Sequence, residues 1–340
     1  MPAAGEAVAA TALTLRGTLG VLGVFSVLAL CLVPLLRMAV QYLFYQLAAF
    51  FSGMVGSQSL SKFLEQLSSA FSLMLAMNWQ GYDNGRIRIT YGPHAPYTCP
   101  VDYLEKVIAE AAANKAEIQM HLCETKFEVD TVVKEHGMTP IQLMNKLGMF
   151  ELGTIAAHCV HLTDEDMDIM AAKHVRVAHN PQSNLKLASG IAPVAAMLNK
   201  GICVGLGTDG ASSNNNLDML EECRAAAMLH KATTFDPLVV PAKKAWEMAT
   251  VDGAKTLGFA DTGLLEAGQQ ADIVLWDMHK PYWYPRHNKL SQLVYAASST
   301  DADTVFVAGK KVVEAGKLLT FDEEKIYAEA EACTRKLLNK

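Results

Sequence analysis

The chain has 340 residues, of which 51% are hydrophobic and only 19% are charged. This composition excludes a disordered protein, because disordered chains have few apolar residues and many charges. The formal net charge of −6 argues against a nucleic-acid binder, which needs a basic face to neutralise phosphates. The seven cysteines are scattered singly and form no CxxC pair, so the sequence indicates no disulfide framework and predicts a cytoplasmic location.

The amino-terminal region, residues 1–80, is apolar and admits two interpretations. Residues 17–61 contain one charged residue, Arg37, and an uncharged run long enough to cross a bilayer. Pro34 and several glycines interrupt that run, and Arg37 would lie in the middle of a membrane hairpin over 17–57. The alternative is buried strand and helix of an α/β domain, whose strands read as continuous apolar runs. Both interpretations stay open, and membrane association is not the favoured one.

From residue 81 on, short β-branched runs alternate with amphipathic stretches. Five runs read as strands, namely RIRITYG, EIQMHL, TIAAHCV, VRVAHNP and ICVGLGTD. Because strands that alternate with helices form parallel sheets, residues 81–260 predict an α/β fold, either doubly wound or closed as a (β/α) barrel. Residues 261–340 predict a small closing β segment, from ADIVLWD and DTVFVAGKKVVEAGKLL, followed by an amphipathic C-terminal helix.

The predicted strands end in histidine or acidic residues. The side chains concerned are His94, His121, Glu124, His158, His161, His179 and Asp209. From His94 through the next three strand-end histidines to Asp209, successive gaps are 27, 37, 21 and 30 residues, each close to one strand–helix unit. A single histidine there is more often structural, but four in register are hard to explain that way. Because the carboxyl ends of parallel strands meet on one face, we expect one shared site.

This set of side chains has the chemistry of a metal-dependent hydrolase. Imidazole nitrogen and carboxylate oxygen are ligands of zinc and related divalent ions, and a catalytic site keeps one position open for water. Such an ion lowers the pKa of its water from 15.7 to about 7. Glu124 follows His121 by three residues and is therefore placed to move protons.

A dinucleotide-binding interpretation is weaker. Gly205, Gly207 and Gly210 spell GxGxxG after an apolar strand. The fingerprint also needs a carboxylate about 20 residues further on to hold a ribose. His230 stands there instead, so the sequence does not support this interpretation.

Several runs of sequence make the chain similar to a known family. They are GPHAPYTC (92–99), HLCETKFEVD (121–130), AAHCVHLTDED (156–166), VAHNPQSNLKLASGIAPV (177–194), VGLGTDGASSNNNLDM (204–219) and GLLEAGQQADIVLWD (263–277). Through them the chain from about Arg86 to its end resembles the amidohydrolase superfamily, in particular its 5-methylthioadenosine/S-adenosylhomocysteine deaminases, beside the triazine hydrolases. The resemblance implies a metal-dependent (β/α) barrel with a small C-terminal β segment.

The resemblance also implies a reaction, the hydrolytic deamination of adenine-type nucleosides with release of ammonia, which is hydrolysis of a C–N bond in a cyclic amidine. It implies that His121 and Asp209 bind one divalent metal, zinc or else iron or another divalent ion. Asp209 is expected to take the proton of the attacking water, and Glu124 to protonate the purine ring. His94, Glu124 and Asp209 are expected to bind substrate. His158 is expected to orient the water or stabilise its charge.

The chain departs from the family pattern at one point. The family's first barrel strand ends in an HxH pair that supplies two metal ligands, and no HxH occurs in these 340 residues. We therefore expect a barrel that is incomplete at its N-terminus, with His158 and His94 as candidates for a third ligand. Exposed sheet edges and apolar surface in such a barrel favour a homo-oligomer.

Two alternatives to the deaminase stay open. One is another amidohydrolase that acts on non-peptide C–N bonds. The other is a binding or scaffold protein whose metal centre is damaged, which the missing HxH favours and which the presence of His94, His121, Glu124 and Asp209 opposes. The expected partner of the enzyme is a small purine nucleoside derivative, and no nucleic acid is expected.

Overall fold

The computed structural model describes residues 80–338 of the chain, which divides into two units, residues 1–89 and 90–340. In the first unit, the described part contains one short helix, α3 (Tyr82–Gly85). Apart from Gln80, the apolar region over 1–80 lies outside the described residues, and so do both interpretations of it. Among the helices that the structure describes, none combines the length and the apolar character needed to cross a membrane.

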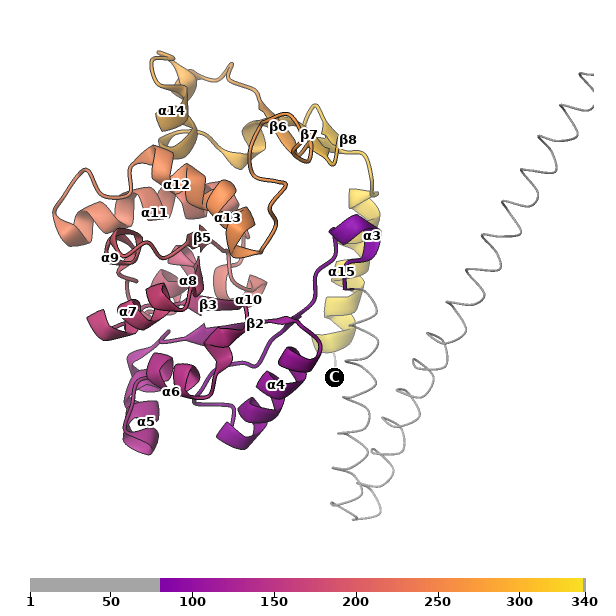
Figure 1. The fold of residues 1–340 in the computed structure, drawn as a ribbon. Coiled ribbons are helices and arrows are strands. Elements are labelled where there is room, and N and C mark those ends of the chain that lie inside the picture. The colour runs from indigo at the N-terminus through magenta and orange to yellow at the C-terminus, as the bar shows by residue number, and fades with distance from the viewer. Residues whose placement is uncertain (1–79, 339–340) are drawn as a thin grey trace, which may run out of the picture. The chain divides into compact units, whose positions relative to one another are not determined.

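The second unit is built on a parallel sheet whose strands pair in chain order (Figure 1). The strands are β1 (Thr90–Tyr91), β2 (Glu117–Leu122), β3 (Thr154–His158), β4 (Arg176–His179) and β5 (Val204–Leu206). All four neighbouring pairs are parallel, which confirms the predicted strands and the α/β class. Within the described residues the sheet is open, because β1 and β5 lie at opposite ends of the strand order.

Helices connect the strands and pack against the sheet. They are α4 (Val101–Ala113), α5 (Lys126–His136), α6 (Pro140–Lys146), η1 (Met149–Glu151), α7 (Asp164–Ala172), α8 (Pro181–Lys186), α9 (Val194–Asn199), α10 (Ala211–Asn214), α11 (Met219–Thr234), α12 (Ala242–Ala249) and α13 (Val251–Thr256). Local sequence explains several of the starts. Thr125, Thr139 and Thr163 each accept a hydrogen bond from a first-turn N–H, which satisfies a donor that has no partner within the helix.

The core lies between the sheet and these helices. Ile118, Met120, Ile155, Val177 and Val204 come from four neighbouring strands and are almost completely buried. Every residue of β3, the central strand, is buried. Burial of apolar side chains is the main favourable term in folding, so this layer holds the strand ends in fixed positions.

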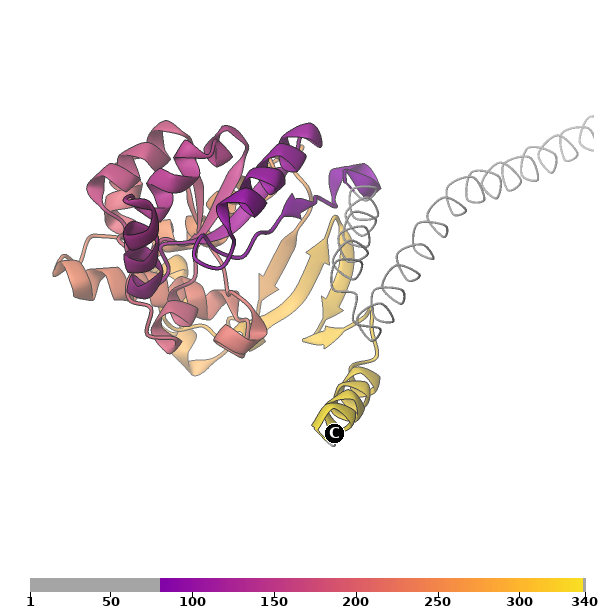
Figure 2. The same cartoon turned by 90° about the horizontal axis from the view of Figure 1, so that it is seen from below.

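A small antiparallel sheet follows the parallel one in the chain and appears as orange-to-yellow arrows in Figure 2. It consists of β6 (Ile273–Trp276), β7 (Ala302–Val307), β8 (Lys310–Glu314) and β9 (Lys317–Leu318). Between and after these strands come η2 (Pro281–Trp283), α14 (Lys289–Tyr295), η3 (Ser299–Asp301) and α15 (Glu323–Leu338). The predicted closing β segment and C-terminal helix are therefore confirmed, while the domain boundaries at 81–260 and 261–340 stay predictions.

Packing explains two of the three glycines that spell GxGxxG. A Cβ at Gly205 would lie 2.9 Å from Gly253 Cα and 2.8 Å from Thr256 Oγ1, so α13 can approach β5 only because no side chain is there. A Cβ at Gly207 would lie 2.3 Å from Asn180 Oδ1. Close packing, against α13 at Gly205 and against the Asn180 side chain at Gly207, thus accounts for these two glycines without a bound nucleotide.

We expect Gly205→Ala to destabilise the chain by about 1–3 kcal/mol, because a side chain forced into a packed contact shifts backbone or neighbouring groups. Chemical denaturation of purified protein measures this loss. Gly92→Ala is the control, since a Cβ at Gly92 would meet no heavy atom within 4 Å. Equal stability of the two variants would contradict the packing explanation.

Candidate metal centre

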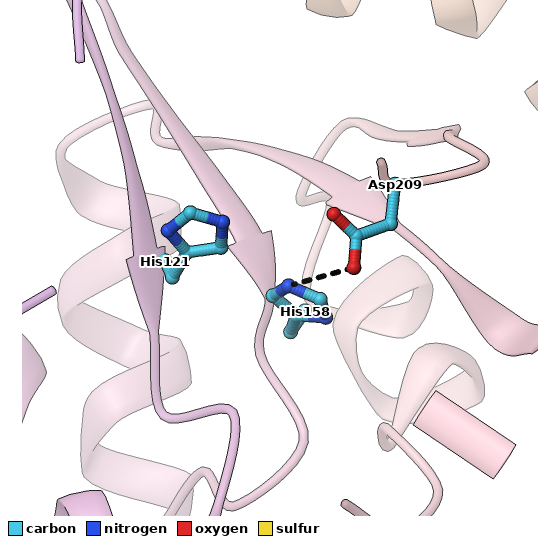
Figure 3. A group of neighbouring side chains, drawn as sticks. All are labelled: His121, His158 and Asp209. Carbon is cyan, nitrogen blue, oxygen red and sulfur yellow. Dashed lines mark ion pairs between the residues drawn. The ribbon is translucent and has the colours of Figure 1, made fainter. Parts of the chain in front are cut away.

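Three side chains, from β2, β3 and the loop after β5, converge at the carboxyl edge of the sheet. His121 lies near the end of β2, His158 ends β3, and Asp209 follows β5. One ligand atom of each lies within 4.8 Å of the others, and Figure 3 shows the three side chains facing a common space. His158 Nε2 is 4.0 Å from Asp209 Oδ2. Two imidazoles and a carboxylate are a common donor set for a catalytic divalent ion.

Both imidazoles are held with the same nitrogen free. His121 Nδ1 donates to the backbone carbonyl of His94 at 2.6 Å, and His158 Nδ1 donates to Asn184 Oδ1 at 2.7 Å. A donating Nδ1–H places the lone pair on Nε2, which is the arrangement that metal-binding histidines commonly show. The two rings stack with centroids 5.3 Å apart. The residues present therefore fit a metal ion, by donor chemistry as well as by proximity.

Asp209 is held as a carboxylate. Ser183 Oγ donates to Oδ2 at 2.6 Å and the Gly210 N–H donates to Oδ1 at 2.7 Å. Burial alone would raise the pKa of Asp209, but these hydrogen bonds and the nearby His158 and His121 outweigh it and lower the pKa below its ordinary value. The ionised form, which is the form that binds a cation, is thus favoured before any metal arrives.

Glu124 lies beside this group. Its Oε2 is 3.8 Å from His158 Nε2, and its Oε1 accepts a hydrogen bond from Ser189 Oγ at 3.1 Å. The side chain is partly exposed, so a carboxylate oxygen at the mouth of the site can exchange protons with a bound molecule. The position agrees with the acid role expected from the sequence, and that role stays a proposal.

A second, buried carboxylate supports the turn that carries Glu124. Glu128 is completely buried in the first turn of α5, and its two oxygens accept the N–H groups of Cys123 and Glu124, each at 2.8 Å. Burial raises the pKa of Glu128 to about 7 although these hydrogen bonds oppose the shift. These two hydrogen bonds therefore fix the backbone of Cys123 and Glu124, which directly follows β2.

The remaining histidines of the predicted site lie outside the three-residue group. His94 is exposed, its Nδ1 bonds Thr98 Oγ1 at 2.7 Å, and its ring centroid is 4.9 Å from that of His121. Of the two candidates for a third ligand, the structure thus groups His158, and not His94, with His121 and Asp209. His161 donates to the Ser189 carbonyl, and buried His179 contacts His230, so neither reaches the metal group.

The backbone at these strand ends adopts a conformation that L-residues rarely use. Cys123, His158, Cys159 and Asp209 all have positive φ, between 52° and 71°. Such a conformation costs free energy for a residue other than glycine and persists only where the surroundings enforce it. Two of the four residues are candidate ligands, so part of the backbone strain of the described chain lies at the site.

A cavity of about 830 Å³ opens beside the candidate ligands. His121 and Asp209 line it. Apolar lining side chains come from the parallel sheet (Ile155 and Leu206), from α12 (Trp246) and from the small antiparallel sheet (Ile273 and Trp276). The volume and the mainly apolar lining with a few polar groups are typical of small-molecule sites.

Sequence reasoning missed the side chains that orient the ligands. Ser183, Asn184 and Ser189 belong to a run that was noted only for its family resemblance, and Glu128 received no role. A signal existed for the first two, because the run HNPQSN follows a strand directly and its polar residues must start the next helix at the same edge of the sheet. Nothing in the sequence marks Ser189 or Glu128 in this way.

Comparison with known proteins assigns these features to a family. The amidohydrolase family model matches residues 29–312. A 5-methylthioadenosine/S-adenosylhomocysteine deaminase of Dictyoglomus thermophilum is 53% identical over 265 residues, which are 78% of this chain and 62% of the relative. One of Pelotomaculum thermopropionicum is 51% identical over 269 residues, 79% of this chain and 62% of the relative. The chain thus spans about 62% of the length of these curated relatives.

Solved structures agree. A zinc-bound adenosine deaminase from Xanthomonas campestris superposes with a TM-score of 0.76 at 35% identity, covering 80% of this chain and 62% of that one. The zinc complex of an atrazine chlorohydrolase from Arthrobacter aurescens superposes with a TM-score of 0.70 at 29% identity, covering 78% and 59%. The fold of most of this chain therefore recurs in two proteins whose structures contain zinc.

We expect Glu128 to make the chain less stable as pH rises. Its pKa is about 7 in the folded state against an ordinary 4.5, so the folded state holds this proton more tightly and loses that advantage as pH rises from about 4.5 through 7. The loss is about 1–3 kcal/mol, measurable by urea unfolding at about pH 5 and about pH 8.

The Glu128→Gln variant, which is neutral at every pH, should lose this part of the pH dependence. Glu135→Gln, at an exposed position on the same helix, should keep it. A parental pH slope in the Glu128→Gln variant would contradict the assignment.

Proposed function

The chain belongs to the amidohydrolase family, and on that premise we propose that it hydrolyses the exocyclic C–N bond of adenine-type nucleosides, 5-methylthioadenosine or S-adenosylhomocysteine, with release of ammonia. The observation that carries the proposal is the convergence of His121, His158 and Asp209 with Glu124 alongside. Relatives of about 50% identity bear the name of this deaminase. Since the chain spans only part of their length, the activity is a proposal for this chain.

We propose that His121, His158 and Asp209 hold one divalent ion, zinc in the first place, as in the related zinc-bound structures. Three protein ligands and one open position are the usual arrangement of catalytic zinc. When bound, the ion supplies hydroxide at neutral pH by lowering the pKa of water to about 7. In this assignment His158 is a ligand, which replaces the water-orienting role that the resemblance alone implies.

The chain's own residues then divide the proton transfers. Deamination adds the oxygen of water to C6 of the purine and removes the amino group as ammonia. Asp209, kept ionised by Ser183 and Gly210, accepts a proton from the attacking water. Glu124 delivers a proton to the ring nitrogen, so that C6 becomes electrophilic enough for addition. Asp209 then gives the proton that it accepted to the amino group, which leaves as neutral ammonia. The proton of the hydroxyl group on C6 passes to Glu124 as the carbonyl forms, so both carboxyl groups return to their starting states.

We propose that the substrate binds at the same edge of the sheet. His94, Glu124 and Asp209 supply polar groups around the candidate metal centre, and the adjoining cavity supplies apolar surface. We propose that the purine base lies against these polar groups. An imidazole that is exposed, as His94 is, is free to hydrogen-bond a sugar hydroxyl or a ring nitrogen.

Location and assembly are part of the proposal. The six cysteines in the described part of the chain are all free thiols, which supports a cytoplasmic location. Within the part of the chain that the structure describes, the parallel sheet ends at β1 and β5, and a sheet with open edges favours association with a second copy. We therefore propose a homo-oligomer.

Metal content gives the first test. We expect about one zinc ion per chain in purified, dialysed protein, because two imidazoles with preset tautomers and one carboxylate suffice for a catalytic site. Atomic absorption measures it. His121→Ala and Asp209→Ala should each lower the content to below about 0.1 per chain. His136→Ala, an exposed histidine on α5, is the control and should leave it unchanged. Absence of zinc and other divalent metals from the parent would refute the metal centre.

Turnover gives the second test. We expect the zinc-loaded chain to release ammonia from 5-methylthioadenosine or S-adenosylhomocysteine, followed by the ultraviolet change from an adenine to a hypoxanthine ring. Glu124→Gln should lower kcat about 10²- to 10⁴-fold, because it removes the group that protonates the ring. Glu135→Gln is the matched control.

Other outcomes of this assay separate the alternatives. Turnover confined to other cyclic amidines would indicate a different amidohydrolase. Zinc binding with no hydrolysis of either class would indicate a binding protein. Full activity of Glu124→Gln would refute the proton-transfer role while leaving the metal centre intact.

A further inference from the structure

A completely buried carboxylate contacts the segments that hold the candidate metal ligands, but none of the ligands themselves. Glu222 is in the first turn of α11 and is 0% exposed. One of its oxygens accepts the backbone N–H of Gln182 at 3.1 Å, and the other accepts the side-chain amide of Asn214. Both partners belong to other elements, α8 and α10, so Glu222 ties three helices together.

The contact with Gln182 leads to two candidate ligands. Gln182 is the second residue of α8, and the next two residues are Ser183 and Asn184. Ser183 donates to Asp209 Oδ2 at 2.6 Å, and Asn184 accepts from His158 Nδ1 at 2.7 Å. Since α8 has only six residues, a shift of its first turn moves both of these groups.

The contact with Asn214 leads to the same ligands by a second route. The Asn214 side-chain amide also donates to the Thr208 carbonyl at 2.9 Å. Thr208 precedes Asp209, whose positive φ needs support from its surroundings. One carboxylate therefore braces the backbone of the Asp209 loop and, through α8, the side chain of Asp209.

The cost of burying the Glu222 carboxylate is not offset by a paired cation among the described residues. None of the ion pairs found among the described residues involves it, and burial raises its pKa to about 7 against the opposing hydrogen bonds from Gln182 and Asn214. Burying a carboxylate without a paired cation costs free energy, which its hydrogen bonds have to offset. The two partners are donors that apolar residues of similar size would leave unsatisfied.

We propose that Glu222 is a positioning residue of the metal centre. Glu222 holds the start of α8 and the loop after β5 in fixed positions, and this sets the orientation of His158 and Asp209. The inference rests on the metal centre of the proposed function. It concerns metal affinity and the state of the His158 ring, both of which are measurable without turnover.

The decisive variant is Glu222→Gln. It keeps the size of the side chain but turns one acceptor into a donor, which then faces either the Gln182 N–H or the Asn214 amide. We expect zinc affinity, measured by competition with a chromophoric chelator, to fall about 10- to 100-fold, the range found when outer partners of metal ligands are removed. Glu221→Gln is the matched control, since the neighbouring Glu221 contacts only side chains, and it should stay within about two-fold of the parent.

A measurement on metal-free protein keeps the inference separate from the proposed function. Long-range ¹H–¹⁵N NMR reports which nitrogen of His158 carries the proton. The parent and Glu221→Gln should show the Nδ1–H form, whereas Glu222→Gln should show a mixture of both forms, with faster amide hydrogen exchange at Gln182. If the parent binds no zinc, the metal centre fails, and this spectrum still decides whether Glu222 orients His158.

A second variant covers the case in which Glu222→Gln does not fold. Asn214→Ala removes the route to Thr208 and leaves the Gln182 contact, so it should weaken zinc binding while the His158 ring keeps its Nδ1–H form. Parental zinc affinity and parental His158 spectra in the folded variants would overturn the proposal, because a carboxylate that only packs α11 would affect thermal stability alone.

Discussion

The parallel register between β2 and β3 is the constraint on which the candidate metal centre depends. His121 pairs with Ala157, and Leu122 pairs with His158, so the two imidazoles sit one residue apart along neighbouring strands. Because successive side chains of a strand point to opposite faces, regular pleating would place the His158 ring on the face opposite to His121, and the positive φ of His158, 71°, at the end of β3 lets the two rings meet. The register is secured because both strands bury apolar residues, with β3 buried along its whole length.

Around this framework, each reactive group has a partner that determines its orientation or charge. A backbone carbonyl orients His121, Asn184 orients His158, and Ser183 keeps Asp209 ionised. Two buried carboxylates also hold the backbone, Glu128 at the turn that carries Glu124 and Glu222 at the start of α8. The site therefore owes its geometry to groups that never touch the reacting atoms, and rigid placement of this kind is what hydrolysis requires of a protein.

Most of the fold and of the reactive set could be predicted from the sequence. Strand–helix alternation predicted the parallel sheet, and strand-end spacing brought His121, His158 and Asp209 together. The distinction between His94 and His158 could not be predicted, because both follow strands and only folding shows which ring faces Asp209. Glu128 and Glu222 escaped notice since an acid on an amphipathic helix ordinarily faces water, and burial becomes visible only in three dimensions.

The positive φ angles at His158 and Asp209 limit how this site can change. Asparagine, aspartate and histidine tolerate the left-handed region better than most residues, whereas β-branched residues pay a steric penalty of about 1–2 kcal/mol there. Substitution at the two ligand positions is thus restricted by the backbone before chemistry is considered. Divergence toward another metal or substrate is easier through Ser183, Asn184 and Ser189, whose φ values carry no such restriction. The positions that can change most easily are therefore those that contact the ligands, and not the ligands themselves.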